Sequence, residues 1–230
     1  GIWKPRTRPN TFEGVGQEGL KWLIDIKEEF GLQVTTEVAS AHHVEACLKA
    51  GVDVLWIGAR TTVNPFSVQA IADALQGVEI PVFVKNPINP DVSLWSGAIE
   101  RIRKSGVSKI GAIHRGFHLS DNRPYRNAPA WELAIQFRTE HADIPLVCDV
   151  SHISGTPELI PHVAQRAFDL DMDGLMVETH QNPSEALSDA QQQLTPSQLH
   201  KLMNSLVIKS ADSKNTEFKN QLDLLPHYSY

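Results

Sequence analysis

The sequence predicts an α/β protein of the (β/α)8 class, a TIM barrel with about six of its eight strands present. Short β-branched runs alternate with helical patterns, and strict alternation of this kind produces a parallel sheet of right-handed βα units. Polar residues follow nearly every strand, and no Gly-x-Gly-x-x-Gly follows any of them, which favours a closed barrel over an open doubly wound sheet. Because a barrel needs eight strands and the sequence does not begin with Met, we expect the first two strands to precede Gly1.

The predicted strands begin near residues 33, 54, 81, 109, 145 and 174. The first helix follows a Gly-rich turn and ends at Gly31, and its expected buried stripe comprises Leu20, Leu23, Ile24 and Phe30. Capping residues then predict the ends of the later helices. One helix is expected to begin after Ser40 and to end at Gly51, and further helices are expected to start at Asn64-Pro65, Thr156-Pro157 and Thr195-Pro196.

Composition narrows the class of function. A net charge of −6 and a pI near 5.9, without a polybasic run, exclude a nucleic-acid or membrane-surface protein and leave small molecules as partners. Two cysteines without disulfide spacing, and no apolar run of membrane-span length, lead us to expect the cytoplasm. We expect one barrel domain over residues 1–208 and a tail or linker over 209–230.

A candidate metal site lies where two predicted strands end. His152 follows one strand, Glu178 ends the next, and Asp189 lies eleven residues further on, close enough to fold back over it. The carboxyl ends of parallel strands are where ligands bind in this class of fold. One imidazole and two carboxylates suit a divalent cation such as Mn²⁺, Fe²⁺, Co²⁺ or Zn²⁺.

Cations recur at the same predicted edge of an otherwise acidic chain: Lys4, Arg6, Arg60, Lys85 and Arg115. Such a group collects anions, and Arg binds phosphate or carboxylate in a bidentate manner. A metal together with these cations therefore predicts phosphorylated substrates.

Each residue also has a structural interpretation. A single Lys or Arg after a strand is usually solvated surface, His152 alone would more often be a hydrogen-bonded structural histidine, and Glu178 could cap a neighbouring helix. Glu37 and Asp149 are either outer partners of the site or loop carboxylates. We expect the pair His42-His43 on an exposed helix face, and Trp56 in the core rather than as a stacking platform.

With these residues in hand, the chain from Gly1 to about Ile208 resembles 3-deoxy-D-arabino-heptulosonate 7-phosphate (DAHP) synthases, the first enzymes of the shikimate pathway to aromatic amino acids. The resemblance rests on the runs Lys4-Pro5-Arg6-Thr7, Gly58-Ala59-Arg60, Val84-Lys85-Asn86, His114-Arg115-Gly116, Asp149-x-Ser151-His152, Val177-Glu178 and Ser188-Asp189. The Lys-Pro-Arg-Thr run favours this family over the related octulosonate 8-phosphate synthases, and sialic-acid-type synthases are more distant.

The resemblance implies a TIM barrel that condenses phosphoenolpyruvate with erythrose 4-phosphate, using a divalent metal held by a cysteine, a histidine, a glutamate and an aspartate. His152, Glu178 and Asp189 match the last three ligands, whereas the family's Gly-Pro-Cys turn has no counterpart here. Lys4, His152 and Glu37 are the implied candidates for proton transfer. The implied substrate-binding residues are Lys4, Arg60, Lys85 and Arg115 for phosphoenolpyruvate and Arg6 and Thr7 for the erythrose 4-phosphate phosphate group.

In a subclass that the chain resembles, a helical chorismate mutase domain follows the synthase, and the run Glu217 to Leu222 would suit the start of its first helix. We expect the full-length form to be a homo-oligomer. The alternative from another class is a catalytically silent barrel, or a subunit, that binds phosphorylated ligands through its cations.

Overall fold

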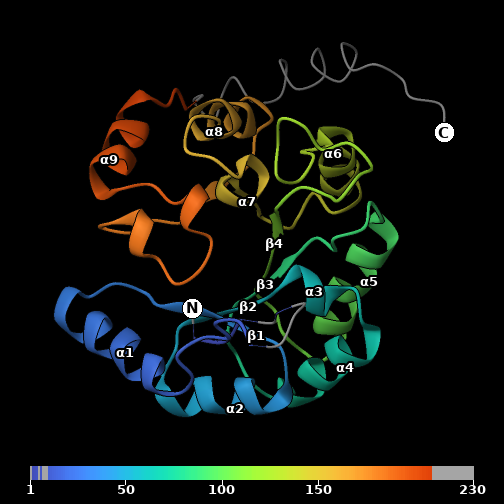
Figure 1. Cartoon of the computed structure of the whole chain (residues 1–230). Helices are drawn as coiled ribbons and strands as arrows, with labels where there is room; N and C mark the ends of the chain where they lie inside the picture. Colours follow the sequence, from blue (N-terminus) through green and yellow to red (C-terminus); the bar gives the residue numbers. More distant parts are fainter. Residues whose placement is uncertain (1, 5, 7–9, 209–230) are drawn as a thin grey trace. The chain divides into compact units, whose positions relative to one another are not determined.

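The computed structural model describes residues 2–4, 6 and 10–208 (Figure 1). It divides into two compact units, Gly1–Ile113 and His114–Tyr230, which are treated separately below as unit 1 and unit 2. The expected tail at 209–230, with the run at Glu217, and the predicted binding residue Thr7 lie outside the described residues.

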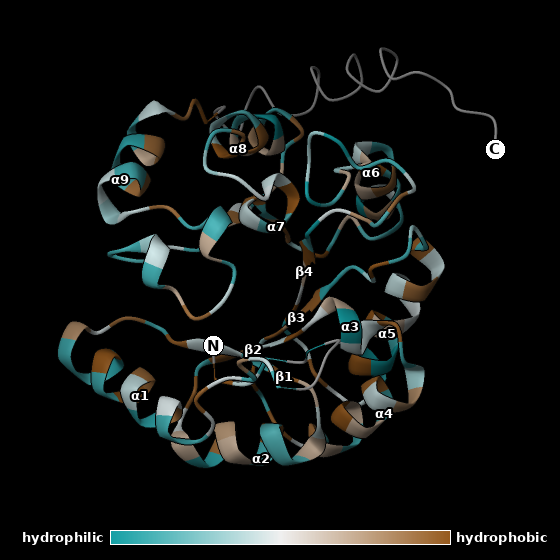
Figure 2. Cartoon of the chain, viewed as in Figure 1, coloured by the Kyte–Doolittle hydropathy of each residue, from teal (hydrophilic) through white to brown (hydrophobic). Residues whose placement is uncertain are grey.

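Unit 1 is built on parallel strands that neighbour one another in chain order: β1 (Thr35–Val38), β2 (Val54–Ile57), β3 (Val82–Lys85) and β4 (Ile110–His114). In the register, Glu37 lies beside Trp56, and Lys85 lies beside Ile113. The predicted parallel βα arrangement is confirmed within this unit. Strands β3 and β4 are among the brown, hydrophobic parts of Figure 2, as expected of strands that are covered on both faces.

The helices of unit 1 are α1 (Glu18–Phe30), α2 (Ala41–Ala50), α3 (Ala59–Thr62), α4 (Pro65–Ala74) and α5 (Val92–Lys104). The predicted caps are confirmed: Ser40 accepts the amide of His43, Asn64 accepts the amides of Phe66 and Ser67, and Gly31 and Gly51 end their helices in the left-handed conformation. Helix α4 packs against α2 and α5.

The helices of unit 1 differ from the sequence analysis at Phe30 and at α3. Phe30 does not belong to the buried stripe of α1, because its side chain is 62% exposed at the last turn of the helix. The short helix α3 was not anticipated, since four residues are too few for a periodic signal. It carries Arg60, which follows strand β2 as predicted and lies on this helical turn.

Unit 2 contains the parallel pair β5 (Leu146–Asp149) and β6 (Gly174–Met176), with Cys148 beside Leu175. Its α-helices are α6 (Trp131–Glu140), α7 (Val150–Ser154), α8 (Ile160–Asp169) and α9 (Pro196–Ser205), and its short 3-10 helices are η1 (Pro183–Glu185) and η2 (Ala190–Gln192). The start of α9 at Thr195-Pro196 is confirmed, with a capping box between Thr195 and Gln198.

The predicted start of a helix at Thr156-Pro157 was wrong. Residues 155–159 form bends and turns after α7, and α8 begins at Ile160, whose following residue is the proline suited to a first turn. No helix within the described ranges combines the length and the apolarity that crossing a lipid bilayer requires.

Candidate functional site: three potential metal ligands and a buried carboxylate

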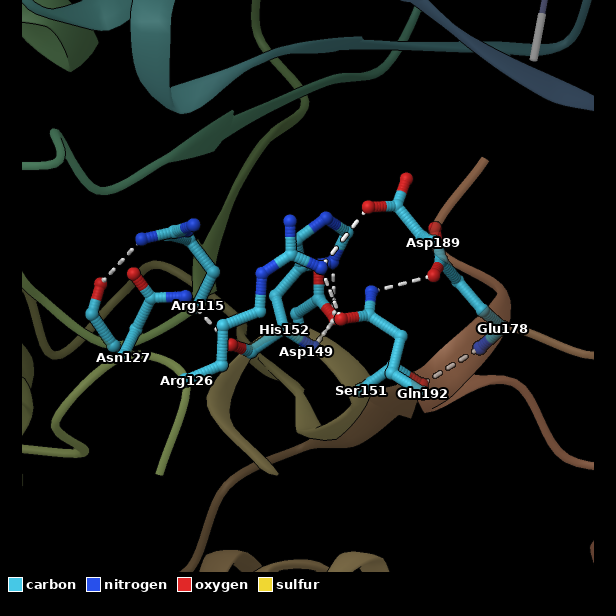
Figure 3. A network of polar contacts seen from close by, with 10 residues as sticks. Arg115, Arg126, Asn127, Asp149, Ser151, His152, Glu178, Asp189 and Gln192 are labelled. Atoms are coloured by element: carbon cyan, nitrogen blue, oxygen red, sulfur yellow. Dashed lines mark hydrogen bonds and ion pairs between the residues drawn. The ribbon is translucent and has the colours of Figure 1, made fainter. Parts of the chain in front are cut away.

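Unit 2 brings together the three predicted metal ligands. His152 lies on α7 directly after β5, Glu178 follows β6, and Asp189 lies just before η2 in the left-handed conformation, with φ 54°. One ligand atom from each side chain lies within 4.8 Å of the others (Figure 3). All three side chains are partly buried. An imidazole and two carboxylates at this spacing form a donor set that fits a divalent transition-metal ion.

The ring of His152 is oriented by Asp149, which is fully buried at the end of β5. The Nδ1 atom of His152 lies 2.9 Å from the Oδ2 atom of Asp149, and the backbone amide of His152 donates to Oδ1 at 3.1 Å. A carboxylate at Nδ1 fixes the ring and leaves Nε2 as the atom that faces a metal. Asp149 thus takes the outer position that the sequence left open between two interpretations.

Glu178 and Asp189 are held by residues that sequence reasoning missed. The Nε2 atom of Gln192 donates to Oε2 of Glu178 at 2.6 Å, and Nη1 of Arg126 lies 3.0 Å from Oδ1 of Asp189. Arg126 also donates to the side-chain oxygen of Gln192. Neither Gln192 nor Arg126 ends a strand. The rule that ligands lie at the carboxyl ends of parallel strands therefore could not locate them.

Neither cysteine of the chain belongs to this group. Cys47 is buried on α2 and Cys148 is buried in β5. Burial raises the pKa of Cys47 to about 12 and raises that of Cys148 well above its usual value, which disfavours the thiolate that binds metals. The three-residue set therefore has no thiolate from the described part of the chain.

Unit 1, taken by itself, contains a separate group of predicted site residues around Glu37. This side chain projects from β1 and is partly buried, and its carboxylate packs against Gly58 so closely that a Cβ added there would lie 1.9 Å from Oε1. Burial raises the pKa of Glu37 to about 7, although the positive charges of Lys85, Lys4 and Arg60 act to lower it. The group is therefore poised to change its protonation state near neutral pH.

Lys85 is the buried cation of unit 1, with 4% of its surface exposed at the end of β3. Its Nζ atom lies 4.3 Å from the ring centroid of Trp56, on the neighbouring strand β2. Trp56 is therefore a partly buried cation–π partner of Lys85, a contact that the sequence did not predict. Arg60, in contrast, is exposed on α3.

Two described residues of the opening segment, Lys4 and Arg6, donate hydrogen bonds to backbone carbonyls. The amide of Lys4 donates to the carbonyl of Glu13 at 2.8 Å, and the Nε atom of Arg6 donates to the carbonyl of Phe12 at 2.8 Å. Trp3 stacks on His43 with ring centroids 4.0 Å apart. His43 is therefore partly buried and structural, which corrects the expectation of an exposed pair, whereas His42 is exposed.

Arg115 and His114 open unit 2, and both are buried. The Nη1 atom of Arg115 donates to the carbonyl of Gly116 at 3.4 Å. His114 packs against the rings of Phe117 and Trp131. Burial lowers the pKa of His114 to about 4, so the imidazole is neutral at physiological pH.

Comparisons with known proteins show the family and the fold class of the chain. The chain is 28% identical over 194 residues to the phospho-2-dehydro-3-deoxyheptonate aldolase of Thermotoga maritima, covering 84% of this chain and 55% of that protein. It is 29% identical over 234 residues to a 2-dehydro-3-deoxyphosphooctonate aldolase of Paraburkholderia phymatum, covering 93% of this chain and 78% of that protein. The chain thus spans little more than half the length of the first relative.

Among solved structures, the chain matches a crystal structure of the Thermotoga maritima phospho-2-dehydro-3-deoxyheptonate aldolase (DAHP synthase) with a TM-score of 0.78 and 25% identity, covering 97% of this chain and 60% of that one. This match confirms the predicted fold class, α/β of the TIM-barrel type with six parallel strands here. The model of the DAHP synthetase I family matches residues 1–213. The chain therefore belongs to the DAHP synthetase I family.

Proposed function

We propose that the protein containing this chain condenses phosphoenolpyruvate with erythrose 4-phosphate to give DAHP and phosphate, the first step of the shikimate pathway. The observation that carries the proposal is the meeting of His152, Glu178 and Asp189 within 4.8 Å in a member of the DAHP synthetase I family. The reducing cytoplasm is the proposed location, because both cysteines are free and buried.

In the proposed reaction, C3 of phosphoenolpyruvate forms a bond to the aldehyde carbon of the sugar phosphate, water adds to C2, and phosphate leaves from C2. A divalent cation held by His152, Glu178 and Asp189 would supply Lewis acidity at the aldehyde oxygen. Asp149 would keep the imidazole of His152 in a single orientation throughout.

The cations of the chain bind and orient the anionic substrates. Lys85, Arg60 and Arg115 are the proposed partners of phosphoenolpyruvate, with Lys4 near its carboxylate, while Arg6 and Thr7 bind the phosphate of the sugar. Lys85 is already fixed over the ring of Trp56, so its charge needs no rearrangement as the substrates react.

Glu37 is the residue that best suits proton transfer. Its pKa of about 7 lies near the working pH, which is the condition under which a carboxyl group can both accept and return a proton. We assign it the proton released when water adds to C2. Lys4 lies close enough for its charge to act on Glu37. Lys4 and His152 are the other proposed candidates for proton transfer.

The test is turnover of phosphoenolpyruvate with erythrose 4-phosphate after the protein has been stripped of metal and reloaded with Mn²⁺, Fe²⁺, Co²⁺ or Zn²⁺. It is made on this chain and on the product of the complete open reading frame. We expect metal-dependent turnover that His152→Ala abolishes, and His162→Ala, on the exposed face of α8, leaves unchanged. Absence of turnover in the complete protein with every metal would refute the proposal.

The octulosonate-type relatives define the second candidate reaction. An eight-carbon product requires a five-carbon aldose phosphate in place of the four-carbon sugar, because phosphoenolpyruvate contributes three carbons. We expect the four-carbon substrate to give the higher kcat/KM, because the chain carries Lys-Pro-Arg-Thr at residues 4–7. The reverse preference would assign the chain to the octulosonate reaction.

A further inference from the structure

The segment that precedes α6 is bonded to the helix that carries His152. The backbone amides of Arg126 and Asn127 both donate to the carbonyl of Ile153, at 3.0 and 3.3 Å. The Nδ2 atom of the buried Asn127 donates to the carbonyl of His152 at 2.7 Å. Gly155 lies against this segment, since a Cβ added to it would lie 2.5 Å from the Cβ of Arg126. The backbone of Arg126 therefore has a fixed place beside the three potential ligands.

From that place the guanidinium of Arg126 is bonded to Asp189 directly and is linked to Glu178 through Gln192. Arg126 lies 3.0 Å from Oδ1 of Asp189 and donates to Gln192, whose Nε2 donates to Oε2 of Glu178 at 2.6 Å (Figure 3). Gln192 is 1% exposed, so its amide cannot exchange this chain of bonds for bonds to water. A planar group with several donors can hold two acceptors at once, which a lysine ammonium does less well.

The two carboxylates need such a partner. Two anionic groups whose oxygens approach within 4.8 Å repel each other, and Asp189 also holds a left-handed backbone conformation that a non-glycine residue adopts at a cost. Without compensation, the segment that carries Asp189 would relieve both penalties by moving that side chain away from Glu178.

We propose that Arg126, acting with Gln192, is a positioning residue that holds Asp189 and Glu178 ready for the divalent cation and thereby raises its affinity. The inference rests on the proposed function, which supplies the cation. Each bond uses one oxygen of a carboxylate, and a carboxylate has two, so the relay and a metal can engage the same side chain. Partners of this kind commonly change metal affinity by about 10- to 100-fold.

The rival account makes Arg126 a competitor that occupies Asp189 until a cation displaces it. Arg126 lines a cavity of about 470 Å³ together with Thr156 and Asp189, and its side chain is 42% exposed. A competitor in this open position would weaken metal binding, whereas a positioning residue strengthens it. The two accounts therefore predict opposite signs for the same substitution.

The experiment is a titration of the metal-free chain with Co²⁺, followed by calorimetry and by the visible absorption of the bound ion. We expect Arg126→Met to bind Co²⁺ at least 10-fold more weakly than the wild type, and Arg126→Lys to fall between the two. The matched control is Arg138→Met, which removes another partly exposed ion pair of unit 2, with Asp173 at 2.6 Å, and should leave the affinity unchanged.

Thermal unfolding of the metal-free variants separates positioning from a general loss of structure. Because one side of each pair is partly exposed, Arg126 in the first and Asp173 in the second, Arg126→Met and Arg138→Met should lower the midpoint by similarly small amounts. Equal or tighter Co²⁺ binding by Arg126→Met would overturn this inference and leave the proposed function standing. Absence of Co²⁺ binding by the wild type would overturn the cation site, and this inference with it.

Discussion

Replacing Glu37 by Gln should stabilise the metal-free protein at alkaline pH. The pKa of Glu37 is raised from 4.5 to about 7 in the folded chain, chiefly by burial. A raised pKa means that the folded state binds the proton more tightly than the unfolded chain does, so ionisation costs stability as the pH rises from 4.5 towards 7. Gln mimics the neutral acid and removes this cost.

The magnitude follows from the two pKa values. A shift of about 2.5 units corresponds to about 3 kcal/mol once both states are ionised, and to about 1 kcal/mol at pH 5, where only the unfolded chain is largely ionised. We therefore expect Glu37→Gln to raise the free energy of unfolding by about 3 kcal/mol at pH 8.5. Near pH 4 the effect should vanish, because Glu37 is then mostly protonated in both states.

Urea unfolding of the wild type and of Glu37→Gln at pH 4, 5 and 8.5, without metal, measures this difference directly. If Glu37 also transfers a proton in the proposed reaction, the same substitution should lower kcat by about 100-fold or more. A variant that is less stable than the wild type at pH 8.5 would show that the attraction of Glu37 to the nearby cations outweighs its burial, and would refute the reasoning about its pKa.

Three further predictions concern single residues. Burial lowers the pKa of His114 to about 4, so the unfolded chain takes up a proton at a higher pH than the folded chain does. Lowering the pH from 7 to 4 should therefore reduce the free energy of unfolding by about 3 kcal/mol through His114. His114→Phe should lose this part of the pH dependence, as measured by urea unfolding. Gly58→Ala should displace the Glu37 carboxylate and lower turnover, whereas Gly97→Ala, where an added Cβ meets no atom within 4 Å, should not. Asn64→Ala should lower the free energy of unfolding by about 1 kcal/mol, because two amides at the start of α4 lose their acceptor.

The sequence predicted those parts of the molecule that depend on local chemistry. Helix caps such as Asn64 were located because an N-cap side chain bonds to amides two or three residues away. His152 and Glu178 were located because parallel strands place their carboxyl ends at one edge. These rules use only neighbours in the chain or the direction of a strand, so they do not need the tertiary structure.

The relay from Arg126 to Gln192 could not be predicted in the same way. Arg126 is 63 residues from Asp189 and 66 from Gln192 along the chain, so their contacts arise only when the loop before α6 folds onto α7. The predictions that Phe30 is buried and that a helix starts at Thr156-Pro157 were wrong for a related reason. Both features depend on how the end of a helix packs, and the residue pattern of the helix does not determine that packing. The role of Trp56 depends on Lys85, which lies on the adjacent strand.

The shifted carboxyl group and the shifted imidazole have opposite effects on the pH dependence of stability. As the pH rises from 4.5 to 6.5, ionisation of Glu37 lowers the free energy of unfolding by about 1.4 kcal/mol per pH unit. Over the same range, the loss of free energy of unfolding that His114 causes becomes smaller by the same amount per pH unit. When the two units unfold together, these contributions cancel in the wild type. Glu37→Gln should therefore lose stability relative to the wild type as the pH falls through this range, and His114→Phe should lose it as the pH rises.

The double variant provides the control for this cancellation. Its free energy of unfolding should differ from that of the wild type by an amount that is constant between pH 4.5 and 6.5, since both slopes have been removed together. A sloping difference would mean that at least one of the two groups has an unshifted pKa. The raised pKa of Glu37 reduces stability, but it also suits Glu37 to the proposed chemistry, because proton transfer near neutral pH needs a group that titrates in that range. His114 has no role in the proposed chemistry, so we expect His114→Phe to remove its cost without lowering turnover.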